Sequence, residues 1–365
     1  MTLELSTAGE SHGPALVGIL IGLPAGLKLD REAIQVDLAR RQEGYGRSPR
    51  QQIETDQVEV LAGLRHGRTL GTPLALVVPN RDHKNWTWGM SPWPPEGEAS
   101  GKGREAVTLP RPGHADLAGV MKYGHDDVRN ALERSSARHT AVIVAAGAVA
   151  KALLHEIGIT VGGSAIAVGG AEGTGIRDAI DAARGERDTL GGLVEVRAQG
   201  VPPGLGSYAT KEERLDARLA WTLLGTQAVK GVEIGDGFAL ASLRGSEAHD
   251  EILRDDAGYR RETNRAGGIE AGVSNGEEIV VRAAMKPLPT LMRPLRSADL
   301  ATGEPAEALV ERSDVAAVEP LAVVAEACVA LELARAAKEK FGGDAVGDFV
   351  AAHRAYVERI PWSPR

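Results

Sequence analysis

Two histidines lie in glycine-bearing motifs whose chemistry suits proton transfer. Residues 9–13 read Gly-Glu-Ser-His-Gly, and residues 111–116 read Arg-Pro-Gly-His-Ala-Asp. The unperturbed pKa of imidazole, about 6.5, makes His12 and His114 candidates for acid–base catalysis near neutral pH. Glycine next to each histidine lets the backbone approach a ligand closely. The two motifs therefore predict an acid–base site.

A set of arginines accompanies these motifs and the glycine turn at residues 44–46: Arg40, Arg41, Arg47, Arg50, Arg111, Arg129, Arg134, Arg138 and Arg312. Any one of them, taken alone, could be an ordinary surface arginine. Guanidinium groups bind phosphate and carboxylate through paired N–H donors, so the set favours a small substrate with several negative charges. The formal net charge of -8 argues against a general nucleic-acid binder.

Two further segments suit ligand contacts. Arg134-Ser135-Ser136 comes just before a long apolar segment, where free N–H groups of a helix start favour a phosphate or a polarised ring. A serine N-cap is the alternative, and both can hold together. Residues 286–290, Lys-Pro-Leu-Pro-Thr, follow a predicted strand, and their prolines end regular strand pairing. A rigid turn is the alternative for this second segment.

Two long apolar segments predict the helices that position these motifs. Residues 140–157 are apolar on almost every side, which is typical of a helix buried all round. Residues 315–341 are also apolar and become cationic before Gly342 and Gly343, which suits a helix C-terminus. Arg-Pro and then Arg-Ser precede each helix, so we predict an internal repeat of two related halves.

Short strands separated by glycine and proline turns are predicted between the helices, for example at Leu193–Arg197 and Ile279–Ala283. Residues 84–105 are rich in tryptophan, proline and glycine and predict an irregular mobile or interface loop. No composition break marks a linker. We therefore expect one α+β domain over residues 1–365.

Several protein classes are excluded by absent signals. Cys328 is the only cysteine, so disulfides and cysteine-rich metal sites within the chain are not expected. The first residues lack a secretion signal, and no uncharged apolar run reaches about eighteen residues, so we expect a cytoplasmic protein that does not span a membrane.

No G-x-G-x-x-G motif follows a strand, which excludes a Rossmann site. Residues 9–13 fit a serine-hydrolase elbow, but Pro14 follows directly and only eight residues precede the motif.

Across nearly its whole length the chain resembles chorismate synthase. The resemblance rests on motifs in the order of that family: GESHG at 9–13, GYGR at 44–47, RPGHAD at 111–116, ERSSAR at 133–138, QAVKGVE at 227–233, GGI at 267–269 and KPLPT at 286–290. It implies a lyase that converts 5-enolpyruvylshikimate 3-phosphate into chorismate and phosphate by trans 1,4-elimination. It also implies reduced FMN as cofactor, a sandwich with long helices between antiparallel sheets, and a homotetramer.

The resemblance further implies roles for individual residues. His12 would support or protonate the leaving phosphate, His114 would manage the proton at the flavin ring, and Asp314 would relay the proton taken from the substrate. Arg41, Arg47 and Arg134 would bind the substrate anions. The residues implied in FMN binding are Arg134, Ser135, Ser136, Gln227, Ala228, Ala271, Lys286, Pro287, Leu288, Pro289, Thr290 and Arg312.

Three positions depart from the family pattern: Ala271 replaces a common glycine, Ser313 replaces a histidine, and His139 replaces an acidic residue. No extra segment would house a flavin reductase, so we expect the flavin to be reduced by a separate NAD(P)H-dependent enzyme. Two other classes stay open from sequence alone. A serine hydrolase would react with a fluorophosphonate at Ser11, and a phosphometabolite-binding protein would bind the substrate without releasing phosphate.

Overall fold

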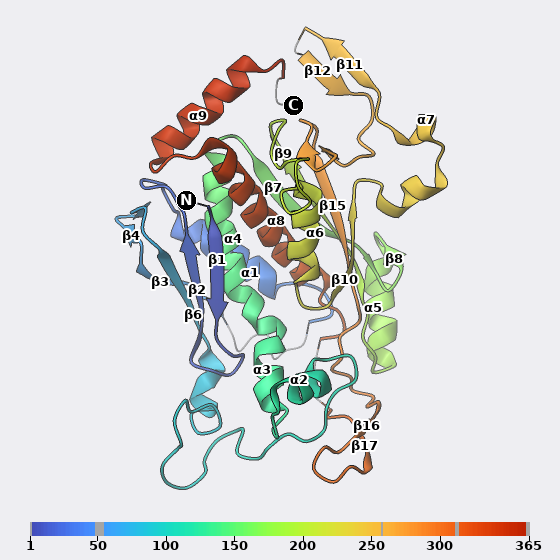
Figure 1. The fold of residues 1–365 in the computed structure, drawn as a ribbon. Helices are drawn as coiled ribbons and strands as arrows, with labels where there is room; N and C mark the ends of the chain where they lie inside the picture. Colours follow the sequence, from blue (N-terminus) through green and yellow to red (C-terminus); the bar gives the residue numbers. More distant parts are fainter. Residues whose placement is uncertain (1, 48–54, 257, 311–313, 363–365) are drawn as a thin grey trace.

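The computed structural model describes residues 2–47, 55–256, 258–310 and 314–362. Arg50, Arg312 and Ser313 therefore lie outside the described residues. Two antiparallel sheets flank a central pair of long helices, α4 (Thr140–His155) and α8 (Val318–Phe341), as Figure 1 shows. The α+β class predicted from the sequence is confirmed.

The first sheet has the strand order β1-β2-β6-β3, with β1 at Glu4–Ala8, β2 at Ala15–Ile21, β6 at Leu74–Pro79 and β3 at Glu59–Ala62. Alternate residues of β6 are fully buried, as expected for a sheet with one face on the core. That face packs against α4. A Cβ at Gly18 of β2 would come within 2.8 Å of a Val142 methyl, so glycine allows the helix to lie close to the sheet.

The second sheet has the order β10-β15-β9-β7-β8, with β10 at Val229–Ile234, β15 at Ile279–Met285, β9 at Gly192–Gln199, β7 at Thr160–Val168 and β8 at Ala171–Glu172. The strands predicted at 193–197 and 279–283 fall inside β9 and β15 and are confirmed. Helix α8 lies on β7 and β9. At Gly163 of β7 an added Cβ would meet the Ala322 carbonyl oxygen at 2.4 Å, so only glycine permits this approach.

Both predicted long helices are confirmed, and they pack directly on each other. At their crossing an added Cβ on Gly147 would lie 2.3 Å from the Ala327 Cβ. Helix α1 (Arg31–Gln42) packs against both. The buried Glu326 carboxylate ties the three helices together, because it accepts hydrogen bonds from Arg40 at 3.0 and 2.9 Å and from Lys151 at 2.6 Å.

The described residues also form α2 (Asp116–Tyr123), α3 (Arg129–Ser135), α5 (Gly175–Gly185), α6 (Leu215–Leu224), α7 (Gly245–Ala248), α9 (Val346–Arg359) and the 3-10 turns η2 (Arg81–Asn85), η3 (Ala137–His139) and η4 (Gly237–Ser242). Outside the two sheets they form small hairpins: β4 (Leu64–Arg65) with β5 (Arg68–Thr69), β11 (Ile252–Asp255) with β12 (Gly258–Arg261), β13 (Ile269–Glu270) with β14 (Val273–Ser274), and β16 (Arg296–Ala298) with β17 (Pro305–Glu307). The internal repeat and the single-domain organisation stay predictions.

Residues 129–155, which run through α3, η3 and α4, are long and apolar enough to cross a membrane by length and composition alone. In the fold, 67% of the apolar window is buried inside the protein. The core helix of a soluble protein has the same length and composition, so this segment is weak evidence for a membrane span.

Candidate active site

One cavity of about 540 Å³ lies where the start of α4, the start of α8 and the β1–β2 turn meet. This volume suits a small-molecule ligand. Both candidate histidines line the cavity. The other predicted site residues in its lining are Arg41, Arg47, Ser135, Ser136, Gln227, Ala228, Lys286, Leu288, Pro289, Thr290 and Asp314.

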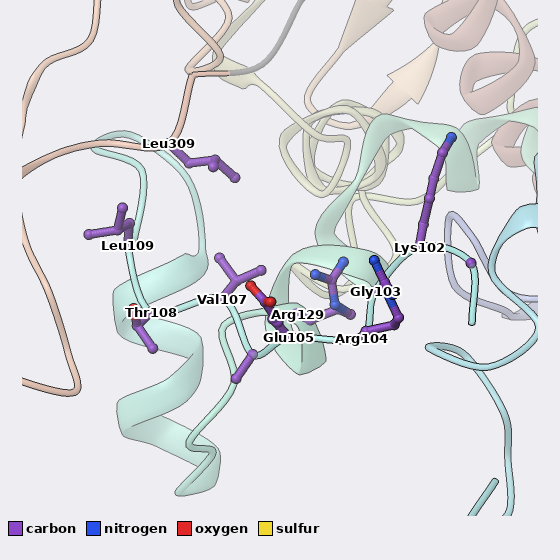
Figure 2. A pocket seen from close by; sticks show the side chains of 11 residues that line it. Lys102, Gly103, Arg104, Glu105, Val107, Thr108, Leu109, Arg129 and Leu309 are labelled. Carbon is purple, nitrogen blue, oxygen red and sulfur yellow. The ribbon is translucent and has the colours of Figure 1, made fainter. Parts of the chain in front are cut away.

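A second, more open cavity of about 530 Å³ is lined by residues 101–109, Arg129 and Leu309 (Figure 2). It contains neither histidine. Of its cations, Lys102 pairs with Asp82 at 3.1 Å and Arg129 stands over the Trp86 ring at 5.0 Å. We therefore take the first cavity as the candidate active site.

His12 is held in place by the buried carboxylate of Glu133, which α3 supplies. His12 Nδ1 lies 2.9 Å from Glu133 Oε1, and the His12 backbone N–H donates to Oε2 at 2.9 Å. The Ser11 hydroxyl donates to the same carboxylate. Although burial alone would raise the pKa of Glu133, these hydrogen bonds hold it below its usual value. The carboxylate thus fixes the position of the imidazole in the turn between β1 and β2.

Trp86 covers one face of the His12 ring. The two rings stack with centroids 4.0 Å apart and planes at 20°. Trp86 is 8% exposed, and its Nε1 donates to Asp82 at 2.9 Å. Part of the segment predicted as an irregular loop therefore supports the site.

His114 is held by Asp116, two residues further on. His114 Nδ1 lies 2.5 Å from Asp116 Oδ1. Arg111 also binds this carboxylate, with Nε 2.8 Å from Oδ2 and a terminal nitrogen 3.2 Å from Oδ1. Burial alone would raise the pKa of Asp116, but the hydrogen bonds from His114 and Arg111 hold it well below its usual range. Both cavity histidines are thus oriented through Nδ1 by an ionised carboxylate.

Positive charge is concentrated at the start of α4. Arg41 and Arg138 both bind Asp56, which is fully buried. Arg41 also donates to Thr140 Oγ1 at 2.9 Å and to the Ala137 carbonyl at 2.9 Å. The pKa of Arg41 is lowered to about 10, mainly by burial and also by the charges of Arg138 and Arg47, while Asp56 opposes the shift. An anion in the cavity would relieve this repulsion between cations.

Arg47 pairs with Asp314 in the wall of the cavity, at 2.7 Å. Burial lowers the pKa of Arg47, while Asp314 opposes the shift. The Arg47 Nε atom is buried and has no hydrogen-bond partner within the described part of the chain. Arg47 Nε is therefore a cationic donor that a ligand could engage, next to the Asp314 carboxylate.

Comparison with known proteins agrees with this geometry. A family model described as chorismate synthase matches residues 3–337. The chorismate synthase of Pelobacter propionicus is 53% identical over 393 residues, covering 98% of this chain and 99% of that protein. That of Desulforudis audaxviator is 51% identical over 386 residues and covers 98% of both. A crystal structure of chorismate synthase matches with a TM-score of 0.79 at 36% identity and covers 99% of both chains.

The chain belongs to the chorismate synthase family. It is accordingly a lyase that converts 5-enolpyruvylshikimate 3-phosphate into chorismate and phosphate, the last step of the shikimate pathway. The serine-hydrolase alternative also lacks its geometry. Ser11 lies between two antiparallel strands instead of opening a helix, and its hydroxyl donates to Glu133.

Several segments that the chorismate synthase resemblance implies in flavin binding line the same cavity. The Lys286 ammonium donates to the Gly113 carbonyl and so joins the 286–290 segment to the second histidine motif. Ser136 caps η3, accepting a hydrogen bond from the Arg138 backbone at 3.3 Å, and still lines the cavity. Ser136 thus caps a 3-10 turn, whereas the N-cap of the long helix α4 is His139, which makes no side-chain cap hydrogen bond.

An unsatisfied acceptor in the same wall tests whether these residues fit a flavin. Gln227 Oε1 is buried and finds no hydrogen-bond partner among the described residues. Leaving such a group unpaired costs about 1–3 kcal/mol, which a ligand N–H or O–H would recover. A flavin carries ring N–H and ribityl O–H donors as well as a phosphate. The donor and acceptor set of this wall therefore fits FMN.

Three residues implied in ligand binding do not line the cavity. The Arg134 guanidinium donates to the Gly9 carbonyl at 3.2 Å and to Thr7, at 3.1 Å to its carbonyl and 2.9 Å to its hydroxyl. Ala271 lies between β13 and β14 with a φ of 51°, a left-handed backbone that itself explains why glycine is favoured there. Pro287 is likewise outside the lining. Their proposed ligand contacts stay predictions.

Sequence reasoning gave no role to Glu133, Asp116, Asp56 or Trp86. Asp116 could have been found, because His-x-Asp places the two side chains within reach of each other. Glu133 and Asp56 carried only a weak signal, an acidic residue beside an arginine-rich motif. Nothing in the sequence indicates that Trp86 would stack on His12.

Proposed function

We propose that the elimination takes place in this cavity, with the substrate and reduced FMN bound together between the two carboxylate-held histidines. The observation that carries the proposal is the shared cavity. His12 and His114 come from segments about a hundred residues apart in sequence, yet both line it beside buried arginines. An acid–base pair close to cationic groups is what removal of a phosphate and a proton requires.

Arg41, Arg47 and Arg138 would supply the field that holds the substrate anions. Arg41 and Arg138 pair with Asp56, and Arg47 pairs with Asp314. Three guanidinium groups gathered at one cavity favour a ligand with a phosphate and two carboxylates, and they would stabilise the charge on the departing phosphate. Arg134 stays a proposed contributor by family resemblance, acting through its position beside the β1 backbone.

His12 would support and protonate the leaving phosphate. Glu133 binds its Nδ1, so the ring is positioned for proton transfer at the other nitrogen. The stacked Trp86 excludes water from one face of the ring. Asp314, held by Arg47, would relay the proton taken from the substrate ring, once the substrate anions compete for Arg47.

His114 would manage the proton at the flavin ring, with its orientation set by Asp116 and Arg111. When bound, reduced FMN supplies the electron density that promotes loss of phosphate and takes up the ring hydrogen. Ser135, Ser136, Gln227, Ala228 and residues 286–290 would hold it. Arg312 and Ala271 stay proposed flavin contacts by resemblance only.

We also propose a cytoplasmic homotetramer whose flavin is reduced by a separate NAD(P)H-dependent enzyme, and a sandwich built from two related halves. Sedimentation that gives only a monomer would contradict the assembly. Turnover driven by NADPH and FMN with the purified chain alone would contradict the need for a separate reductase.

The function is tested by anaerobic incubation of the chain with reduced FMN and 5-enolpyruvylshikimate 3-phosphate. We expect free phosphate and the diene absorbance of chorismate to appear together. Oxidised FMN under the same conditions is the matched control and should give neither product. Tight substrate binding without phosphate release would instead favour a phosphometabolite-binding protein.

A further inference from the structure

His139 lies between the first sheet and the cavity wall that contains Gln227. It is the last residue of η3, and its ring lies between β1 and the segment before β10. His139 Nε2 is 3.1 Å from the Thr7 hydroxyl, and Nδ1 is 3.0 Å from Gln227 Nε2. The ring therefore connects a strand residue to a side chain of the cavity wall.

The hydrogen bonds of this network follow from the orientation of the Gln227 amide. With Nε2 as the amide atom nearest the ring, Gln227 donates, so His139 Nδ1 accepts and carries no proton. The proton of the neutral ring then lies on Nε2, which donates to the Thr7 hydroxyl. Arg134 also donates to this hydroxyl, at 2.9 Å. With its Nε2 directed to His139, Gln227 keeps Oε1 as the buried acceptor without a partner in the described chain.

The charges around His139 maintain this assignment. The pKa of His139 is lowered to about 4, mainly by burial and also by the charges of Arg134 and Arg41, while the hydrogen bond with Gln227 opposes the shift. Arg134 belongs to α3 and Arg41 to α1. The ring is thus neutral at physiological pH, and its Nδ1 lone pair is available to the amide.

We propose that His139 is a positioning residue that fixes the orientation of the Gln227 side-chain amide, so that Oε1 accepts an N–H or O–H of the bound flavin. This inference rests on the proposed flavin site. It differs from the family pattern, in which an acidic residue is common at this position. A carboxylate would accept the same amide hydrogen bond, so the two residue types serve one purpose by different chemistry.

The experiment is a titration of the full-length chain with oxidised FMN, followed by quenching of flavin fluorescence. His139→Leu keeps volume but offers no acceptor, and we expect it to weaken FMN binding about tenfold. His139→Glu restores an acceptor and should bind within about twofold of the wild type. At saturating flavin, kcat of His139→Leu should stay within about twofold, because the residue acts on binding.

A double-mutant cycle with Gln227→Ala separates positioning from general stability. If His139 acts through Gln227, adding His139→Leu to Gln227→Ala should cause no further loss of affinity. A tenfold loss that persists in the Gln227→Ala background would overturn the inference, and so would wild-type affinity in His139→Leu. If His139→Leu does not fold, as judged by its melting temperature, His139→Ala replaces it with the same expectations.

The outcome also distinguishes this inference from the function on which it rests. A wild-type chain that binds no FMN overturns the proposed flavin site and the inference with it. Wild-type binding that all His139 variants leave unchanged overturns the role of His139 alone.

Discussion

The two cavity histidines are oriented by the same chemistry but by different parts of the chain. His114 is held by Asp116 within a six-residue motif, which Arg111 completes. His12 is held by Glu133, 121 residues away in sequence, on a helix that packs beside the β1–β2 turn. The first arrangement forms from local sequence. The second exists only when α3 is in place, so its geometry depends on the tertiary structure.

The charge balance differs as well. Asp116 faces both a histidine and a buried arginine, so its charge is compensated within the motif. Glu133 binds a histidine, a hydroxyl and a backbone N–H, and its arginine, Arg129, is 3.8 Å away. Loss of Asp116 should therefore affect mainly stability, whereas loss of Glu133 should affect mainly the reactivity of His12.

Removing either imidazole should have the largest effect on turnover. We expect His12→Ala and His114→Ala each to lower kcat by about 10²- to 10⁴-fold, because each removes an acid–base group. Both variants should still bind FMN and substrate, as measured by fluorescence and equilibrium dialysis. His249→Ala, at an exposed position far along the chain, is the control and should match the wild type. Near-normal turnover in His114→Ala would end its proposed role.

Replacing the two carboxylates should separate the two arrangements. Asp116→Asn removes the charged carboxylate with which Arg111, 6% exposed, pairs, and should lower the free energy of unfolding by about 3–5 kcal/mol. Glu133→Gln keeps one acceptor oxygen and should cost about 1 kcal/mol, yet lower kcat about tenfold or more. Urea unfolding and steady-state kinetics on both variants measure these quantities. If Asp116→Asn and Glu133→Gln lost the same free energy of unfolding and the same kcat, the proposed difference between the two carboxylates would be wrong.

His139 offers a third case, an imidazole with no carboxylate partner in the described chain. Its folded pKa of about 4 lies below the unfolded value near 6.5, so the unfolded chain binds a proton first as the pH falls. Its stabilising contribution is complete above pH 6.5 and is lost as the pH falls toward 4. After allowance for solvent screening, we expect wild type to lose about 1–2 kcal/mol relative to His139→Gln between pH 7.5 and 5. Urea unfolding of both proteins at several pH values tests this, and parallel curves would refute it.

The sequence predicts well those features that depend on local pattern. The helices at 140–157 and 315–341 were predictable because continuous apolar character over that length leaves no solvent-facing side. Both histidines and the arginines around them were recognisable from residue type and neighbouring glycines. The roles of individual site residues, in contrast, came from the family resemblance and not from residue type or spacing.

The remaining features depend on contacts between distant segments. Stacking of Trp86 on His12 joins a loop to a turn, and no periodicity encodes such a meeting. Arg134 looks like an anion-binding residue in sequence, but in the structure it donates to the backbone carbonyls of Thr7 and Gly9. The role of His139 was also beyond sequence reasoning, because it depends on which partner each ring nitrogen meets.

The smallest predicted effect concerns Trp86, which gives His12 a stacked neighbour that His114 lacks in the described structure. Trp86→Phe keeps an aromatic face and should leave kcat within about twofold, although the hydrogen bond to Asp82 is lost. Trp86→Leu removes the stacking, worth about 0.5–1.5 kcal/mol, so kcat should fall about two- to tenfold. FMN affinity, which we propose depends on Ser136, Gln227 and residues 286–290, should not change. If Trp86→Leu lost as much flavin affinity as kcat, the setting of His12 and the flavin contacts would be coupled. The two histidines could then not be treated as independent arrangements.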